Sequence, residues 1–217
     1  MNESTNGLPE PSAAAQTTED HAYTVRLVEK QYAWWKRYVD VQAPYRWNLL
    51  RLKPGFTLEI GCGIGRNLKH LAGNGVGLDH NVHSVDFAKH QGLKAFTPED
   101  FKKSEYCRED SFDSILLSHV AEHMTQDQLE TLLKEYIPLL RQDGKIILIT
   151  PQEVGYRSDH THVEFMDFPK LRSVIRKIGF QPVREYSFPF PRPIGHLFIY
   201  NEFVVVGRRT RRLGDRA

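Results

Sequence analysis

The stretch from Leu58 to Leu68 constrains this chain more than any other. A short apolar run, residues 56–60, predicts a buried strand, and glycines then occupy every second position at 61, 63 and 65. A helical pattern begins at Leu68. Glycine takes positive φ without a Cβ clash and lets the backbone approach a ligand, and the free N–H groups of a helix N-terminus then face that ligand. The stretch therefore predicts a ligand-binding turn, and a tight turn without a ligand is the alternative.

The rest of the chain predicts one domain with short additions, which suits its 217 residues. We expect a polar, disordered tail over residues 1–18, the domain over 19–207 and a basic tail over 208–217. A hydrophobic content of 40% is enough for a core, and a formal net charge of +2 gives no strong overall field.

The two cysteines, Cys62 and Cys107, are too few for a disulfide framework, which favours a reducing compartment. No apolar run has the length of a membrane span, and the polar start of the chain lacks the apolar core of a signal peptide. The sequence therefore predicts a cytoplasmic protein without a membrane partner.

Strands and helices alternate from Phe56 to Phe180. The expected strands cover residues 56–60, 76–79, 93–96, 112–117, 145–149, 180–188 and 196–206. The expected helices cover residues 19–39, with Trp34 and Trp35, and the segments opened by Pro44, Gly65, Asn81, Thr125 and Asp167. A long loop, from residue 150 to about 166, follows the fifth strand. The alternation predicts an α/β fold with right-handed crossovers and a largely parallel sheet covered by helices on both faces.

The glycine pattern separates two families that share such a sheet. The dinucleotide fingerprint G-x-G-x-x-G fails in both registers, because its third glycine would be Arg66 or Leu68. The sequence reads E-x-G-x-G-x-G from Glu59, which resembles the first motif of class I S-adenosylmethionine (SAM) dependent methyltransferases. The resemblance covers nearly all of the chain after Tyr45. It implies a Rossmann-like, seven-stranded, mostly parallel sheet with an antiparallel C-terminal hairpin edge, and SAM as the cofactor.

The resemblance also implies cofactor-binding roles. In the family, the glycine loop passes under the methionine part of SAM, and the acidic residue, here Glu59, helps to fix the loop and the ligand amine. Asp79 ends the second strand, where a carboxylate can accept hydrogen bonds from both ribose hydroxyls. The remaining cofactor candidates are Gly61, Gly63, Gly65 and His80, with Glu99, Asp100 and Phe101 for adenine, Ser118 and His119 for the sulfonium side, and Tyr45 or Arg46 for the carboxylate. The alternatives are a solvent-exposed helix at 99–101, a packed Tyr45 and a solvated Arg46.

Residues 119–123 read H-x-x-E-H, a motif also found in zinc peptidases. A peptidase site needs this motif inside a longer helix and a third ligand further along the chain. Here the motif directly follows a strand, so the sequence favours the methyltransferase interpretation, in which these residues line the substrate mouth.

Histidines near the strand ends suggest how an acceptor could be activated. A hydroxyl is a poor nucleophile until a base takes its proton, and His is the usual base near neutral pH. The candidates are His119, His123, His160 and His162, of which we expect His123 or His162 to be the general base. Asp159 could orient one of them, or join Glu122 in binding Mg²⁺ through oxygen ligands.

The acceptor is suggested by resemblance alone. Residues 150–153, 158–165 and 201–206 resemble actinobacterial methyltransferases that act on sugars, among them the mycobacterial 1-O-methyltransferases of methylmannose polysaccharide synthesis. This implies O-methylation of a saccharide. A small aromatic or quinone-type acceptor and a non-catalytic SAM-binding protein are the alternatives, and a homodimer is left open. A nucleic-acid substrate is disfavoured, because the basic run is confined to the tail and no separate recognition domain is present.

Overall fold

The computed structural model describes residues 40–209. The expected disordered tail at 1–18, the helix at 19–39 with Trp34 and Trp35, and the tail beyond residue 209 lie outside the described residues. Within residues 40–209, no helix is both long enough and apolar enough to cross a lipid bilayer.

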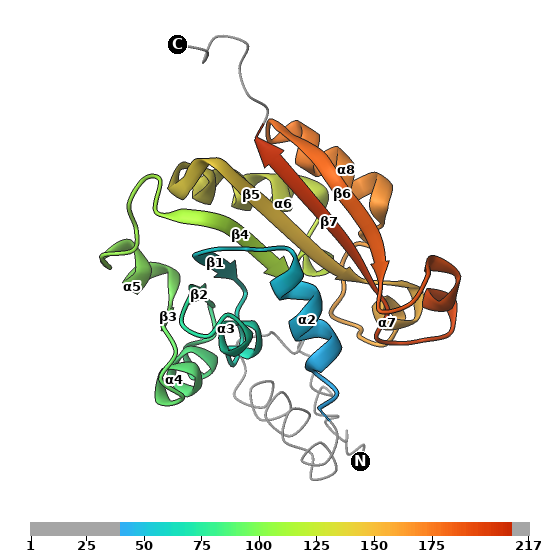
Figure 1. Cartoon of the computed structure of the whole chain (residues 1–217), viewed down its shortest axis with the longest axis horizontal. Coiled ribbons are helices and arrows are strands. Elements are labelled where there is room, and N and C mark those ends of the chain that lie inside the picture. The colour runs from blue at the N-terminus through green and yellow to red at the C-terminus, as the bar shows by residue number, and fades with distance from the viewer. Residues whose placement is uncertain (1–39, 210–217) are drawn as a thin grey trace, which may run out of the picture.

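One seven-stranded sheet forms the centre of the molecule, in the order β3-β2-β1-β4-β5-β7-β6 (Figure 1). The strands are β1 (Thr57–Ile60), β2 (Gly75–Leu78), β3 (Ala95–Phe96), β4 (Phe112–Ser118), β5 (Leu140–Pro151), β6 (Phe180–Phe188) and β7 (Glu202–Arg209). The first five strands pair in parallel, and β7 pairs antiparallel with both β5 and β6. The predicted mostly parallel sheet with an antiparallel C-terminal edge is confirmed.

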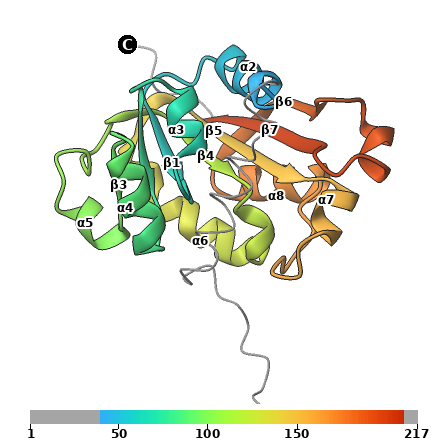
Figure 2. The same ribbon diagram turned by 90° about the horizontal axis from the view of Figure 1, so that it is seen from below.

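Helices cover both faces of this sheet (Figure 2). They are α2 (Ala43–Arg51), α3 (Arg66–His70), α4 (Val82–His90), α5 (Pro98–Lys102), α6 (Gln126–Tyr136), α7 (Glu153–Arg157) and α8 (Phe168–Lys177), with short 3₁₀ turns η2 (Ala121–His123), η3 (Ile137–Leu139) and η4 (Arg192–His196). One buried cluster packs α2, α3 and α4 against one face, and a second packs α5, α6 and α8 against the other. Because both faces are covered, the central strands are buried in consecutive positions instead of alternate ones.

The helix starts follow from short polar side chains placed as the sequence predicted. Asn81 accepts a hydrogen bond from the backbone N of Ser84, and Asp167 accepts one from that of Lys170. Thr125 opens α6 with a complete capping box. These caps fix where each helix begins, and therefore where each strand-to-helix loop ends.

Three predicted segments differ from the structure. β5 begins at Leu140 instead of after Gly144, with a register shift opposite the start of β4. The loop after β5 contains a short helix, α7. The last strand begins at Glu202 instead of near His196, because residues 192–196 form a 3₁₀ turn next to two prolines and the Asn201 side chain bonds to the carbonyl of Phe190.

Candidate active site

The glycine loop between β1 and α3 has the backbone that only glycine adopts freely. Gly61, Gly63 and Gly65 have φ of 73°, 51° and 81°. A Cβ on Gly61 would lie 2.3 Å from Cγ2 of Val120, so the loop after β4 packs directly on the glycine loop. This contact joins the predicted cofactor loop to the segment that carries the histidines.

Asp79 points toward the glycine loop. Its Oδ2 accepts a 2.7 Å hydrogen bond from the backbone N of Gly63, and its Oδ1 accepts one of 2.9 Å from that of Asn81. The carboxylate is therefore fixed between the ends of β1 and β2, and its remaining lone pairs suit ribose hydroxyls. His80 lies beside it, half exposed, with its ring Nδ1 3.8 Å from Oδ1 of Asp79.

Glu59 is buried on β1 just before the glycines. Its Oε1 accepts a 2.7 Å hydrogen bond from Nδ2 of Asn67, whereas its Oε2 is buried and has no hydrogen-bond partner among residues 40–209. Burial raises the pKa of Glu59 to about 8, against the hydrogen bond from Asn67, which lowers it. An unsatisfied buried carboxyl oxygen beside a glycine loop fits a cationic ligand group such as an amine.

His119 leaves β4 with a positive φ of 59° and is held by two acids. Its Nε2 lies 2.7 Å from Oε1 of Glu202, and its Nδ1 lies 3.4 Å from Oε1 of Glu122. Burial disfavours the imidazolium, but the carboxylates of Glu122 and Glu202 outweigh it and raise the pKa of His119 to about 9. His119 is therefore protonated at neutral pH and poorly suited to accept a proton.

His123 and His162 lie together beyond the carboxyl end of β4, on the same side of the sheet as the glycine loop. Their ring centroids are 4.8 Å apart, and Tyr156 stacks on His162 at 5.1 Å. The loop after β5 is fixed to η2 because the backbone N atoms of Val163 and Glu164 both donate to the carbonyl of Glu122. This pairing is what places His162 beside Glu122 and His123.

Asp159 reaches this pair only through Thr161. Its Oδ1 accepts hydrogen bonds from the backbone N and the hydroxyl of Thr161, at 2.9 and 2.8 Å. Thr161 in turn contacts Nδ1 of His123. Asp159 therefore positions the loop instead of facing Glu122, and the structure does not bring these two acids together as a shared oxygen site.

The residues predicted to contact adenine lie on α5. Phe101 is 1% exposed and packs in the core against Phe112 and Tyr136, so its ring has no free face, and the prediction that it stacks on adenine is wrong. Glu99 and Asp100 lie exposed in the first turn of α5. His160 is also exposed, and it is not part of the ring contact between His123 and His162.

The α2 candidates have other partners. Arg46 forms a 2.7 Å ion pair with Asp40, and both side chains are about half exposed. Tyr45 donates a hydrogen bond to the carbonyl of Tyr200 and packs edge-on against Phe188, and burial raises its pKa. In this structure Tyr45 is thus a packed residue and Arg46 a surface ion-pair partner, and a role of either at a ligand carboxylate stays a prediction.

The H-x-x-E-H segment does not form the helical site of a zinc peptidase. Residues 121–123 make one short 3₁₀ turn, and His119 bonds to Glu202 instead of sharing a helix face with His123. Ser118, the last residue of β4, lies beside this turn. Sequence analysis missed Glu202, Thr161 and Val120. The signal for Glu202 was the antiparallel direction of the last strand, because it brings the start of β7 beside the carboxyl end of β5.

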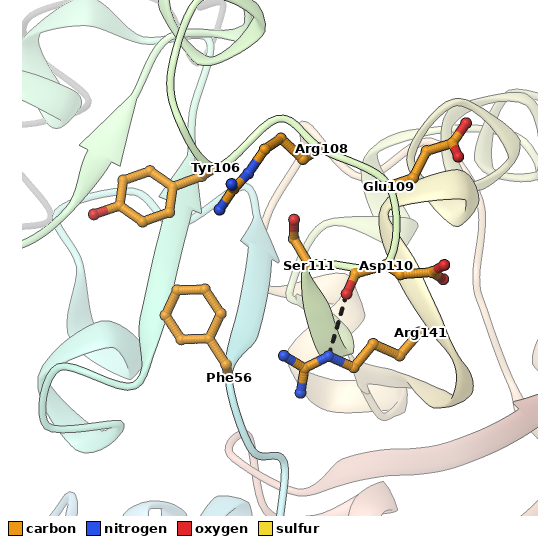
Figure 3. Close-up of a pocket in the computed structure, with 7 residues that line it drawn as sticks. All are labelled: Phe56, Tyr106, Arg108, Glu109, Asp110, Ser111 and Arg141. Carbon is orange, nitrogen blue, oxygen red and sulfur yellow. Dashed lines mark hydrogen bonds between the residues drawn. The ribbon is translucent and has the colours of Figure 1, made fainter.

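A separate hollow of about 430 Å³ lies where β1 and β4 begin, at the opposite end of these strands from the glycine loop (Figure 3). It is lined by Phe56, Tyr106, Arg108, Glu109, Asp110, Ser111 and Arg141. Nε of Arg141 donates to the carbonyl of Asp110, and its NH1 pairs with Asp113. This hollow is remote from the glycine loop and takes no part in the candidate site.

Comparison with known proteins gives the family context. Residues 58–148 match the model of a methyltransferase domain. No curated protein matches the chain in sequence. A SAM-dependent methyltransferase structure from Archaeoglobus fulgidus is 16% identical with a TM-score of 0.64, covering 88% of this chain and 100% of that one.

Two further structures are similar to the chain. A TehB-like SAM-dependent methyltransferase from Corynebacterium glutamicum is 18% identical, with a TM-score of 0.62 and coverage of 88% and 100%. The 1,6-didemethyltoxoflavin-N1-methyltransferase of Burkholderia thailandensis, with its substrate and S-adenosylhomocysteine bound, is 21% identical, with a TM-score of 0.56 and 94% of each chain covered. Residues 58–148 thus match a methyltransferase domain, and the similar structures share the fold of this chain.

Proposed function

We propose that this protein transfers a methyl group from SAM to a hydroxyl of a small molecule or saccharide, with a mannoside or oligosaccharide as the first acceptor to test. His123 or His162 takes the hydroxyl proton. The observation that carries the proposal is the contact of Val120 with Gly61, because it holds the turn that carries His123, beside which His162 lies, against the glycine loop.

The cofactor side of the proposal uses three elements of the chain. Glu59 offers its unpaired Oε2 to the ligand amine, the glycine loop lets the backbone approach the methionine part, and Asp79 accepts hydrogen bonds from the ribose. SAM supplies an electrophilic methyl group when bound. The protein's task is then to hold the acceptor oxygen in line with that group.

The base assignment follows from ring nitrogens. Nδ1 of His162 lies 2.6 Å from the carbonyl of Tyr156, which can only accept, so this nitrogen carries the proton and Nε2 keeps the lone pair. Burial lowers the pKa of His123, so its imidazole is neutral at pH 7 and able to accept a proton. His119, held by two acids, serves as a fixed positive charge instead.

The saccharide acceptor is supported by the sequence resemblance and by Tyr156, whose partly exposed ring lies beside His162. A small aromatic acceptor is the second candidate. It is favoured by the similar Burkholderia enzyme, whose bound molecule, 1,6-didemethyltoxoflavin, is such a compound.

The test is formation of S-adenosylhomocysteine from SAM with a panel of mannosides, oligosaccharides and phenols. We expect turnover with at least one hydroxyl acceptor, falling 100-fold or more in His123→Ala or His162→Ala, as general-base loss predicts, and unchanged in His160→Ala. Binding of SAM without turnover of any acceptor would favour a non-catalytic SAM-binding protein. No binding of SAM or its product by folded protein would end the proposal.

A further inference from the structure

Three side chains next to the carboxyl end of β4 form a compact group of potential metal ligands. One carboxylate oxygen of Glu122 and one ring nitrogen each of His123 and His162 all lie within 4.8 Å of one another. Nε2 of His162 is 4.0 Å from Oε1 of Glu122. The group combines two neighbouring residues of η2 with one residue from the loop after β5.

Both imidazoles are oriented as metal-binding histidines usually are. Nδ1 of His162 donates to the backbone carbonyl of Tyr156. The hydroxyl of Thr161 donates to Asp159, so its oxygen and the Thr161 carbonyl are acceptors for Nδ1 of His123, at 3.2 and 3.3 Å. With both Nδ1 atoms protonated, both Nε2 atoms keep a lone pair. A carbonyl that accepts from the other ring nitrogen in this way fixes the tautomer of a metal-bound histidine.

Glu122 is the independent sign that something is missing from this group. Its side chain is completely buried, and neither carboxylate oxygen has a hydrogen-bond partner among the described residues. Nδ1 of His119 lies 3.4 Å from Oε1 without hydrogen-bond alignment, and Nε2 of that ring already bonds to Glu202. A buried carboxylate without a hydrogen-bond partner is costly, so this group has room for a cation that would pair with it.

We infer that Glu122, His123 and His162 bind a divalent transition-metal ion of the Zn²⁺ type through two Nε2 atoms and one carboxylate. Two imidazoles and one carboxylate are a ligand set of zinc and non-haem iron sites and leave positions open for water or an acceptor oxygen. Mg²⁺ prefers oxygen ligands, so the same set selects against it. The site differs from a zinc-peptidase motif, because His119 is not a ligand and Glu122 is one.

The observed spacing needs only a small adjustment. Zinc–ligand bonds of about 2.0–2.2 Å in a tetrahedral site place neighbouring ligand atoms about 3.3 Å apart. The widest separation, 4.8 Å, would therefore close by about 1.5 Å around an ion. The side chains that would move lie on a turn and a loop, where rotation about χ angles achieves such shifts without moving the sheet.

The metal site has a consequence for the proposed function, on which this step rests. An ion would take the Nε2 lone pairs that a general base needs, so metal binding and proton transfer exclude each other on His123 and His162. We therefore expect saturating Zn²⁺ to lower methyl transfer at least 10-fold and a chelator to restore it. Turnover unchanged by saturating Zn²⁺ would overturn this competition.

The binding test uses the full chain, freed of metal with a chelator, titrated with Zn²⁺ by calorimetry and with Co²⁺ by absorption spectroscopy. We expect one ion per chain, no binding of Mg²⁺, and a loss of affinity of at least 10-fold in Glu122→Gln, His123→Ala and His162→Ala. The matched control is His160→Ala, an exposed histidine of the same loop, which should bind as the unchanged protein does. Thr161→Val, which removes the hydroxyl that joins Asp159 to Nδ1 of His123, should weaken binding about 10-fold or more.

Two results separate this inference from the proposed function. Equal Zn²⁺ affinity in His162→Ala and His160→Ala, in variants that keep SAM binding, overturns the metal site and leaves methyl transfer standing. Site-specific Zn²⁺ binding by a protein that turns over no acceptor keeps the metal site and removes the proposed function.

Discussion

Asn67 donates a 2.7 Å hydrogen bond to Oε1 of Glu59 from the first turn of α3 and leaves the second carboxyl oxygen buried and unpaired. One side chain after the glycine loop thus holds an acid that precedes it. The pairing links the shape of the loop to the ionisation of Glu59, whose pKa burial raises to about 8.

The ligand-free protein should therefore lose stability as the pH rises from 4.5 to 8. The pKa of Glu59 is higher in the folded than in the unfolded chain, so its stabilising contribution is complete below pH 4.5 and is lost as the pH approaches 8. The change is on the order of 1.4 kcal/mol per pH unit. Urea unfolding at several pH values measures it, and Glu59→Gln should flatten this part of the curve.

Binding of SAM at neutral pH should release a proton. A ligand amine beside Glu59 favours the carboxylate, so its pKa falls on binding. Calorimetry in two buffers of different ionisation enthalpy should give different binding enthalpies, and Glu59→Gln should remove the difference. Identical enthalpies in both buffers for the unchanged protein would place the amine away from Glu59.

Asp79→Asn should weaken SAM binding by about 10- to 100-fold. Hydrogen bonds to a charged group are worth about 1.5–3 kcal/mol, and the amide replaces one accepting oxygen by a donor that faces a backbone N–H. Calorimetry measures the affinity. Asp86→Asn, an exposed acid on α4, is the control and should bind as before. Equal affinity in both variants would show that Asp79 does not contact the ligand.

Gly65→Ala should destabilise the fold much more than Gly73→Ala. Both glycines have positive φ, 81° and 91°, but a Cβ on Gly65 would lie 2.3 Å from Cδ1 of Leu93, whereas Gly73 has nothing within 4 Å. Gly73→Ala therefore measures the backbone cost, about 1–2 kcal/mol. We expect Gly65→Ala to exceed it by about 1–3 kcal/mol in urea unfolding; equal losses would mean that Leu93 moves aside freely.

Glu202→Gln should cost about 1–2 kcal/mol of unfolding free energy, because it removes the charge from a nearly buried partner of His119. His119 is itself 36% exposed in its side chain, so solvent screens part of the effect. Glu185→Gln breaks the exposed pair with Arg172 and should cost less than about 1 kcal/mol. Similar losses for both would show that the His119 pair is screened like a surface one.

The fold was predictable because its signals are local. Alternating glycines, caps such as Asn81 and Asp167, and apolar runs bounded by turns each report on a few neighbouring residues. The position of Asp79 beside the glycine loop was predictable for the same reason, since it directly follows β2. The glycine pattern indicated a methyltransferase, and residues 58–148 match the model of a methyltransferase domain.

The rest of the site depends on contacts between distant segments. The sequence does not say that α5 turns the ring of Phe101 toward the core. Phe101 was therefore wrongly expected to contact adenine. The approach of His162 to Glu122 depends on backbone hydrogen bonds from residues 163 and 164 to a turn some forty positions earlier. Thr161 and Glu202 carry no motif, and only the packing of the loop and the direction of β7 bring them to the histidines.

The reversed direction of β7 makes the two ends of the domain interdependent. Its first residue, Glu202, lies beside the carboxyl end of β5 and pairs with His119. Its later residues pair with β5 back toward Lys145. A polypeptide that ended before residue 202 would therefore lack one of the two carboxylates that hold His119 and would leave an open edge on β5. Synthesis must therefore reach β7 before His119 can pair with Glu202.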